Sequence, residues 1–258
     1  MVTVGDIKQD SNIRILLYGP SGAGKTMLGL TLGKGLHVID IDGNLISGAT
    51  FDDQHHQHRR AATVLDCREP NPREPVSWAK AKSNLETIAE AGENWEGQAL
   101  MIDSLTALCS SCMSYVQARD GWKSSGRGGP TQGQYGTFGV EMINFLMRMH
   151  SIPRIVILTA HDTEVWQDDV QGVKVYVPGK MLPPQIPIRF TEIWYLKPVK
   201  DEASPDDNPR YTRELITSPT SSIFCCSRLQ VPSGTKVDSG LPAILNKCGI
   251  DFERRPLD

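Results

Sequence analysis

Short apolar runs rich in β-branched residues alternate along the chain with longer stretches in which apolar residues recur at helical spacing. The short runs are residues 13–19, 36–42, 62–67, 99–103 and 154–160. Their length and composition are typical of strands buried on both faces of a sheet. The stretches with helical spacing are residues 26–34, 76–91, 105–118 and 139–150. This alternation predicts an α/β fold with a mostly parallel sheet and helices on both faces.

Beyond residue 163 the pattern changes to shorter segments that are separated by turns. Residues 173–178, 192–199 and 210–219 form this part. The polar stretch DEASPDDNP separates the last two segments, and it predicts that they form an antiparallel hairpin added to one edge of the sheet. Near the end of the chain, residues 241–247 are expected to form a short helix.

Composition and charge exclude several classes of protein. The chain has 258 residues, 27 of them basic and 30 acidic, and a formal net charge of -3. A hydrophobic fraction of 39% allows a sizeable core and argues against disorder. No apolar run approaches the roughly 20 residues that span a bilayer, and residues 1–12 lack an apolar signal segment. We therefore expect a soluble cytoplasmic protein with no membrane partner, in which any contact with nucleic acid is local.

Cysteines and histidines offer two possible metal sites. Cys109 and Cys112 form a Cys-x-x-Cys pair, but they lie in an apolar helical stretch. We expect them to be packing residues in a reducing compartment, with a metal or redox role as the alternative. Segment 52–60 holds three histidines and two carboxylates without a cysteine at zinc spacing, so it is interpreted as a solvated loop.

A glycine-rich octapeptide directly after the first strand and before the first helix carries the clearest chemistry. It consists of Gly19, Pro20, Ser21, Gly22, Ala23, Gly24, Lys25 and Thr26, a full GxxxxGK[ST] pattern. Such a loop curls its backbone N–H groups around phosphates, while Lys25 reaches the β- and γ-phosphates and Thr26 offers a hydroxyl to Mg²⁺. A turn without a ligand is the alternative. The pattern predicts a nucleoside triphosphate site.

Polar residues at the ends of other strands complete this candidate site. Asp103 closes the run ALMID and precedes a helix, which is the position of a carboxylate that holds magnesium; an aspartate that only caps the helix is the alternative. Asp40 and Asp42 end the second run, and one of the two is expected to face the nucleotide. Thr159 and His161 lie at the carboxyl end of the strand predicted at 154–160, where a polar side chain can sense the γ-phosphate or simply cap the strand.

Together these motifs resemble a RecA-type ATPase core. The anchors are GPSGAGKT, VIDIDG, LMIDSLTAL and VILTAH, in that order. The compact length is similar to that of the short RecA-like proteins of bacteriophages, which include single-strand annealing recombinases. The resemblance implies a core at 13–228, a lead segment 1–12 and a C-terminal tail 229–258. It also implies an Mg-ATP-hydrolysing protein of phage-type recombination in the bacterial host cytoplasm.

The resemblance implies roles for several residues. At two of these positions the sequence departs from the family pattern. Asp42 occupies the place of the glutamate that activates water, one methylene shorter, and His161 stands where a glutamine usually couples nucleotide to DNA. Two segments, 119–135 and 163–184, correspond to the loops that bind single-stranded DNA. The candidate contacts combine positive charge with aromatic rings. They are Arg119, Trp122, Lys123, Arg127 and Tyr135.

The resemblance finally implies an assembly of several identical subunits. Arg228 corresponds to a residue that reaches the phosphates bound by a neighbouring subunit, and a surface arginine is the alternative. A single-strand-binding protein is a further expected partner. A nucleotide-dependent assembly switch without significant hydrolysis and a P-loop kinase of small molecules remain alternatives. The Asn246-Lys247 pair lacks the aspartate that reads guanine, which argues against a GTPase.

Overall fold

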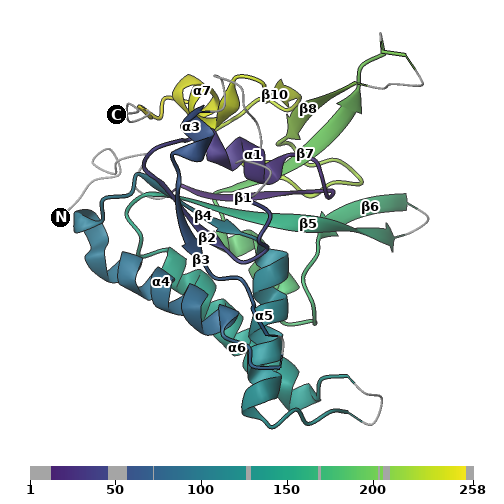
Figure 1. Ribbon diagram of the computed structural model, residues 1–258. Coiled ribbons are helices and arrows are strands. Elements are labelled where there is room, and N and C mark those ends of the chain that lie inside the picture. Colours follow the sequence, from purple (N-terminus) through teal and green to yellow (C-terminus); the bar gives the residue numbers. More distant parts are fainter. Residues whose placement is uncertain are drawn as a thin grey trace, which may run out of the picture.

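A mixed sheet runs through the protein, with helices on both of its faces (Figure 1). The computed structural model describes residues 13–45, 57–71, 73–125, 129–167, 170–202, 204–205 and 210–253. The strands are β1 (Arg14–Gly19), β2 (Leu36–Asp40), β3 (Thr63–Asp66), β4 (Ala99–Asp103), β5 (Ile155–Gln167), β6 (Val170–Val175), β7 (Glu192–Lys200), β8 (Tyr211–Ile216), β9 (Cys226–Ser227) and β10 (Thr235–Lys236). The helices are α1 (Lys25–Leu30), α3 (Gln57–Arg60), α4 (Ser77–Ala91), α5 (Leu105–Arg119), α6 (Gln132–Met149) and α7 (Gly240–Lys247). Short 3₁₀ turns lie at Gly92–Asn94, Pro183–Gln185 and Pro187–Arg189.

The order of the strands across the sheet is β10-β8-β7-β1-β5-β4-β2-β3. From β7 to β3 all neighbours are parallel, while β8 and β10 add antiparallel strands at one edge. The predicted α/β fold and the hairpin at one edge of the sheet are therefore confirmed. Because parallel strands end at the same edge, the register sets Asp40 beside Asp103 and Gly19 beside His161.

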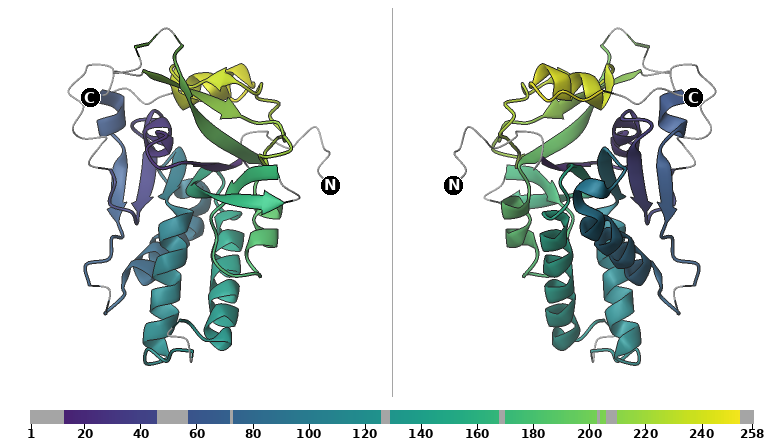
Figure 2. Two further views of the ribbon diagram at one scale, coloured as in Figure 1. Left: turned by 90° about the vertical axis from the view of Figure 1, so that its right-hand side faces the viewer. Right: turned by 90° about the vertical axis from the view of Figure 1, so that its left-hand side faces the viewer.

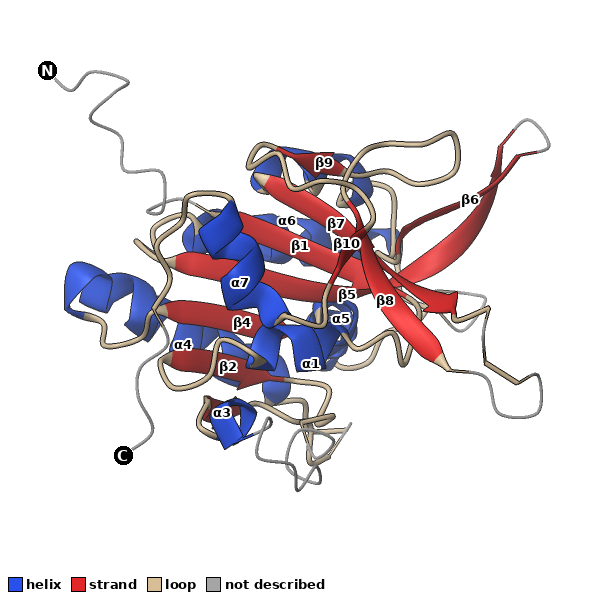
Figure 3. Ribbon diagram, turned by 90° about the horizontal axis from the view of Figure 1, so that it is seen from above, coloured by secondary structure: helices blue, strands red, loops and turns tan. Residues whose placement is uncertain are grey.

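Two hydrophobic clusters fill the space on either side of the sheet. Along β1, Leu16 and Tyr18 face the cluster beneath α4, α5 and α6, whereas Ile15 and Leu17 face the cluster beneath α1 and α7. Figure 3 shows α1 and α7 on the near face of the sheet and the three long helices behind it. Burial on both faces is confirmed for β1, β2 and β4.

Four details of the predicted pattern are wrong. Strand β3 is not buried on both faces, because it is the edge strand, and Val64 is 48% exposed. The first helix ends at Leu30 rather than near residue 34, and α6 begins at Gln132, well before residue 139. The strand predicted at 154–160 continues to Gln167.

The segment 163–184 is also only partly a loop. The second half of β5 pairs antiparallel with β6, and this hairpin projects beyond the parallel strands (Figure 1). Residues 176–182 then return as a connection to the 3₁₀ turns. The prediction of a single flexible loop is therefore wrong for the part in β5 and β6.

The C-terminal segment packs against the sheet and against α1. Leu241, Ile244 and Leu245 of α7 belong to the cluster that also buries Leu17 and Leu28. The Leu241 N–H donates a hydrogen bond to the hydroxyl of Thr31, directly after α1, at 2.8 Å. Among the described residues, no helix combines the length and the apolar character needed to cross a membrane.

Candidate functional site

The candidate phosphate loop, residues 19–26, joins β1 to α1 at the carboxyl edge of the parallel strands. Gly19 and Gly24 have φ angles of 154° and 92°, a region that other residues rarely adopt. A Cβ atom on Gly19 would lie 2.5 Å from the carbonyl oxygen of Leu196, so the loop starts in direct contact with β7. Glycine is therefore required here both for its backbone conformation and for lack of space.

Lys25 provides a buried positive charge inside this loop. Its Nζ donates to the first two carbonyls of the loop, at 2.9 and 2.8 Å. Burial lowers the pKa of Lys25, and the nearby carboxylates of Asp103, Asp162 and Asp42 oppose that shift. Among the described residues, neutral carbonyls are the only hydrogen-bond acceptors of this ammonium group, which is therefore well placed to exchange them for the oxygens of an anion.

Asp103 lies at the end of β4, beside the loop. It is 2% exposed, and its Oδ2 accepts a hydrogen bond from the Thr26 hydroxyl at 2.8 Å. Its Oδ1 accepts a hydrogen bond from the hydroxyl of Thr159 on β5. Burial raises the pKa of Asp103, because a carboxylate charge is costly to place in a site with little water.

Thr26 and Asp103 have the chemistry of a magnesium site. Hydroxyl and carboxylate oxygens are the hard ligands that Mg²⁺ prefers, and these two oxygens already lie within hydrogen-bond distance of each other. A divalent cation would also offset the cost of burying the Asp103 charge. These two residues would hold the ion, and the ion would supply charge neutralisation for the phosphates.

Asp42 lies just beyond the end of β2, in a half-buried position. Its backbone N–H donates to the carbonyl of Asp103 at 3.1 Å, which ties the turn after β2 to the end of β4. Its carboxylate is close enough to Lys25 and Asp103 to influence the pKa of each. The structure thus brings Asp42 to the phosphate loop, and its role in activating water stays a prediction.

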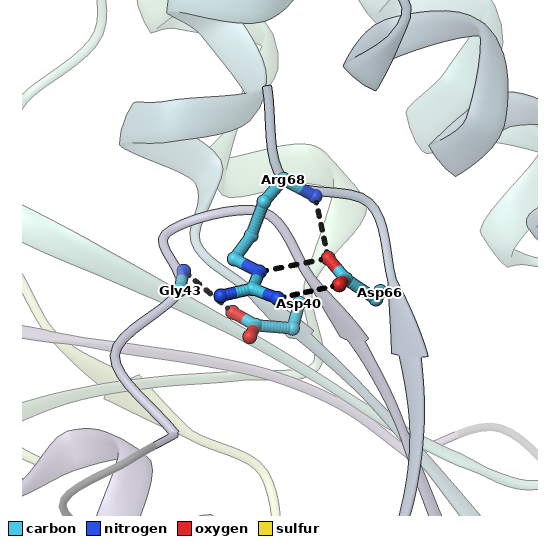
Figure 4. Close-up of polar contacts among 4 residues, drawn as sticks. All are labelled: Asp40, Gly43, Asp66 and Arg68. Carbon is cyan, nitrogen blue, oxygen red and sulfur yellow. Dashed lines mark hydrogen bonds and ion pairs between the residues drawn. The ribbon is translucent and has the colours of Figure 1, made fainter. Parts of the chain in front are cut away.

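Asp40 has a different environment, although it lies only two residues from Asp42. Its Oδ1 accepts the N–H of Gly43 at 2.8 Å, which closes a tight turn. Figure 4 shows the guanidinium of Arg68 lying across this turn, with its hydrogen bonds directed to Asp66. Residues two apart in a strand share a face, but β2 ends at Asp40 and the chain then bends. Asp40 therefore shapes the turn, and Asp42 is the one of the two whose carboxylate influences the pKa of Lys25.

His161 lies at the carboxyl edge of β1, opposite Gly19 in the register. Its backbone N–H donates to the hydroxyl of Thr106 in α5 at 3.1 Å, and its carbonyl accepts the N–H of Tyr176 at 2.8 Å. The expectation that the strand ends there is wrong, because pairing with β6 carries β5 onward. His161 is nevertheless placed beside the phosphate loop.

Two further residues, Asp162 and Arg213, lie near the loop although the sequence analysis does not assign them to the site. Asp162 follows His161, influences the pKa of Lys25 and accepts a hydrogen bond from the hydroxyl of Tyr195 at 3.1 Å. Arg213 on β8 donates from Nε to the carbonyl of Ala23, inside the loop, at 2.9 Å. No local motif marks Arg213, because only the order of strands brings it to the loop.

Arg228 is far from the phosphate loop of its own chain. It follows β9, which pairs with the amino end of β7, and its backbone N–H donates to Glu192 at 2.9 Å. Glu192 is level with Ile15 near the beginning of β1, at the opposite end of the sheet from the loop. A contact with the phosphates of a neighbouring subunit stays a prediction.

The candidate DNA-binding residues cluster where α5 ends and α6 begins, away from the sheet (Figure 2). Arg119 and Lys123 are exposed, and Trp122 is 47% exposed with a positive φ of 57°. Tyr135 lies in the first turn of α6 rather than in a loop, because Thr131 and Gln134 form a capping box at the start of this helix. Arg127 lies outside the described residues.

A groove next to Tyr135 joins the two segments predicted to bind DNA. Its volume is about 630 Å³, and it lies between the first half of α6 and residues 178–182. Tyr135 is 39% exposed, and a Cβ on Gly179 would lie 3.5 Å from its ring. Lys180 and Gln132 are the polar residues at this mostly apolar surface.

The structure describes one of the two candidate metal sites and only part of the other. Cys109 and Cys112 are buried in α5, and burial raises the pKa of both thiols, so the prediction that they are packing residues is confirmed. Within the described ranges, no group of three or more histidine, cysteine or acidic residues is arranged to hold a metal ion. His55 and His56 lie outside those ranges.

Comparison with known protein families gives a match over most of the chain. The model of a protein family described as an AAA domain matches residues 11–229 of the chain. That range includes the phosphate loop, Asp42, Asp103, His161 and Arg213. No curated protein matches the chain.

Proposed function

The chain belongs to the AAA domain family of nucleotide-binding P-loop ATPases, and from this premise we propose that it hydrolyses Mg-ATP and acts on single-stranded DNA. The biological setting that we propose is phage-type recombination or annealing. In that setting the protein works as a homo-oligomer in the cytoplasm of a bacterial host, together with a single-strand-binding protein.

The observation that supports the ATPase part is the contact between the Thr26 hydroxyl and Oδ2 of Asp103 at 2.8 Å. These two residues come from the loop and from a strand two places away in the sheet, yet their oxygens converge on one point. A hydroxyl and a carboxylate that meet beside a phosphate loop can hold one magnesium ion against the β- and γ-phosphates.

Each residue of the site has a distinct task in the proposed reaction. The backbone N–H groups of the loop after Pro20, together with Lys25, bind the phosphates and place the γ-phosphate at the end of β1. Asp42 would accept a proton from the attacking water, and hydrolysis would release ADP and phosphate. His161, at the same edge of the sheet, would respond to the presence of the γ-phosphate.

The DNA part of the proposal is supported by the exposed aromatic and basic residues at the junction of α5 and α6. Trp122 and Tyr135 offer rings on which bases can stack, and Arg119, Lys123 and Lys180 add positive charge near them. Since the net charge of the chain is -3, binding is expected to be weak in one subunit and sensitive to salt. An oligomer would multiply it through many linked sites.

Substitution of Lys25 by alanine tests the ATPase proposal. We expect ATP binding to be lost and turnover to decrease by about 100-fold or more, because an ammonium group at the phosphates is worth several kcal/mol. The measurement is phosphate release with and without a single-stranded oligonucleotide, which should stimulate the wild-type protein. Lys236→Ala, at an exposed position on β10, is the matched control. Full activity of Lys25→Ala would refute the ATPase proposal, and turnover indifferent to DNA would refute the DNA proposal.

Substitution of Tyr135 by alanine tests the groove as a DNA site. We expect the Kd for an oligonucleotide of thymidines to rise by about 5- to 100-fold at low salt, because one stacked base contributes about 1–3 kcal/mol. Fluorescence anisotropy measures the affinity, and Tyr211→Ala, another exposed tyrosine, serves as the control. An unchanged affinity in Tyr135→Ala would remove the groove from the proposed DNA path.

An assembly switch is the second candidate function, because Asp42 has a shorter side chain than the glutamate of RecA-type enzymes. In this case ATP would drive oligomerisation without being consumed. Light scattering with ATP and with a non-hydrolysable analogue separates the two functions. Equal oligomers with negligible phosphate release would favour the switch.

A further inference from the structure

Arg213 lies beside the phosphate loop but belongs to neither the loop nor any of its motifs. It comes from β8, which pairs with β7, and β7 in turn pairs with β1. Its backbone lies between two segments of the sheet, because it is opposite Pro198 of β7 and its carbonyl accepts the N–H of Val237, directly after β10, at 3.2 Å. The side chain therefore projects from a fixed point at the edge of the sheet.

The guanidinium group of Arg213 makes a specific contact with the loop. Its Nε donates to the carbonyl of Ala23 at 2.9 Å, and Ala23 is 1% exposed. A Cβ on Gly24 would lie 2.9 Å from this same Nε, so the loop approaches the arginine as closely as a glycine allows. The contact uses a carbonyl of the loop and leaves its backbone N–H groups available for phosphates.

The other end of the guanidinium group carries hydrogen-bond donors that have no acceptor among the described residues. Arginine carries five N–H donors, and the contact with Ala23 occupies only the one on Nε. Within the described part of the chain, Nη1 and Nη2 make no hydrogen bond or ion pair. Arg213 is an exposed residue, so these nitrogens are accessible to a ligand.

We propose that Arg213 binds the phosphates of the nucleotide within its own subunit, as a second cation beside Lys25. The planar fork of an arginine matches the spacing of two phosphate oxygens, and the bond from Nε orients this fork along the loop. The ligand class is a nucleoside triphosphate. This inference rests on the proposed function, because it adds a binding residue to the same site.

Three substitutions of Arg213 distinguish two roles of this residue. In the first its charge binds phosphate, and in the second its side chain only supports the loop. Arg213→Gln keeps an N–H donor for the Ala23 carbonyl but removes the charge. Arg213→Lys keeps the charge but not the fork, and Arg213→Ala removes both. The affinity of the full chain for Mg-ATP is measured by calorimetry, and thermal unfolding without nucleotide checks that each variant is folded.

We expect affinity for Mg-ATP to decrease in the order Arg, Lys, then Gln and Ala together, with the last two weaker than the wild type by about 10- to 100-fold. Arg210→Ala, an exposed arginine directly before β8, is the matched control and should bind like the wild type. If Arg213→Gln binds within about twofold of the wild type, the side chain only supports the loop and the inference is overturned.

The proposed function and this inference fail in different ways. Wild-type protein that does not bind Mg-ATP, or a Lys25→Ala variant that binds it fully, would refute the proposed function. Binding that requires Lys25 but is unaffected in Arg213→Gln would refute the inference alone.

Discussion

Asp103→Asn is expected to reduce kcat for ATP hydrolysis by about 100- to 1,000-fold, because the substitution removes a metal-binding charge worth several kcal/mol. The shape of the side chain is retained, and its amide oxygen can still accept the hydrogen bond from Thr159. Thr26 can rotate its hydroxyl to accept from the new amide group. The loss therefore reflects the missing charge rather than a change in packing.

The same substitution should not destabilise the protein in the absence of Mg-ATP. Because burial raises the pKa of Asp103, folding favours its protonated form. Its contribution to stability is present below the ordinary pKa of aspartate and is lost as the pH rises through the raised pKa. At neutral pH the neutral asparagine should therefore unfold at the same temperature as the wild type or a higher one.

Phosphate release and thermal unfolding, each with and without Mg-ATP, provide the measurements. Asp103→Asn should lose most of the stabilisation that Mg-ATP gives to the wild type. Asp238→Asn changes the same side chain at an exposed position and should match the wild type in both assays. Turnover within tenfold of the wild type would show that Asp103 does not hold the metal.

Glu192→Ala is expected to lower the free energy of unfolding by about 3–5 kcal/mol, because it leaves several buried donors without an acceptor. Glu192 is 0% exposed at the start of β7. Its Oε1 accepts the backbone N–H groups of Arg228 and Leu229, both at 2.9 Å. Its Oε2 accepts from the indole of Trp194 at 3.0 Å and from the Ser227 hydroxyl at 2.6 Å.

Glu192→Gln provides a graded comparison. The amide oxygen can keep the two backbone donors, while the amide nitrogen would face the Trp194 indole, which can only donate. We expect this variant to lose about 1–3 kcal/mol in urea unfolding, less than the alanine variant. Glu164→Ala, an exposed glutamate on β5, should change stability by less than about 0.5 kcal/mol. Equal stability of Glu192→Ala and the wild type would contradict the assigned hydrogen bonds.

The fold class and the phosphate loop were predictable because their signals are local. A strand, eight residues of fixed pattern and a helix follow one another in the chain, and Asp103 ends a second apolar run. The proximity of Thr26 and Asp103 then follows from parallel strands ending at the same edge of a sheet. The start of α6 also had a local signal, since Thr131 and Gln134 have the spacing of a capping box.

Other features depend on which strands become neighbours, and the sequence does not show this. The exposed face of β3 arises from its place at the edge of the sheet, although the composition of its residues predicts a buried strand. The continuation of β5 past His161 depends on pairing with β6. Arg213 reaches Ala23 only because β8 lies two strands from β1, across a long separation in the chain.

The hydrogen bond from Leu241 to Thr31 and the packing of α7 beside α1 have a consequence for where the chain can be cut. The family match ends at residue 229, and every motif residue of the site lies before that point. The six-residue helix after the phosphate loop nevertheless shares a hydrophobic cluster with side chains from residues 241–252. A protease cut or an early stop codon after residue 229 would therefore preserve the whole nucleotide motif. It would also remove the apolar side chains of residues 241–252 and expose the rest of the cluster that packs against α1. The shortest fragment that carries the motifs is not the shortest fragment that keeps them in place.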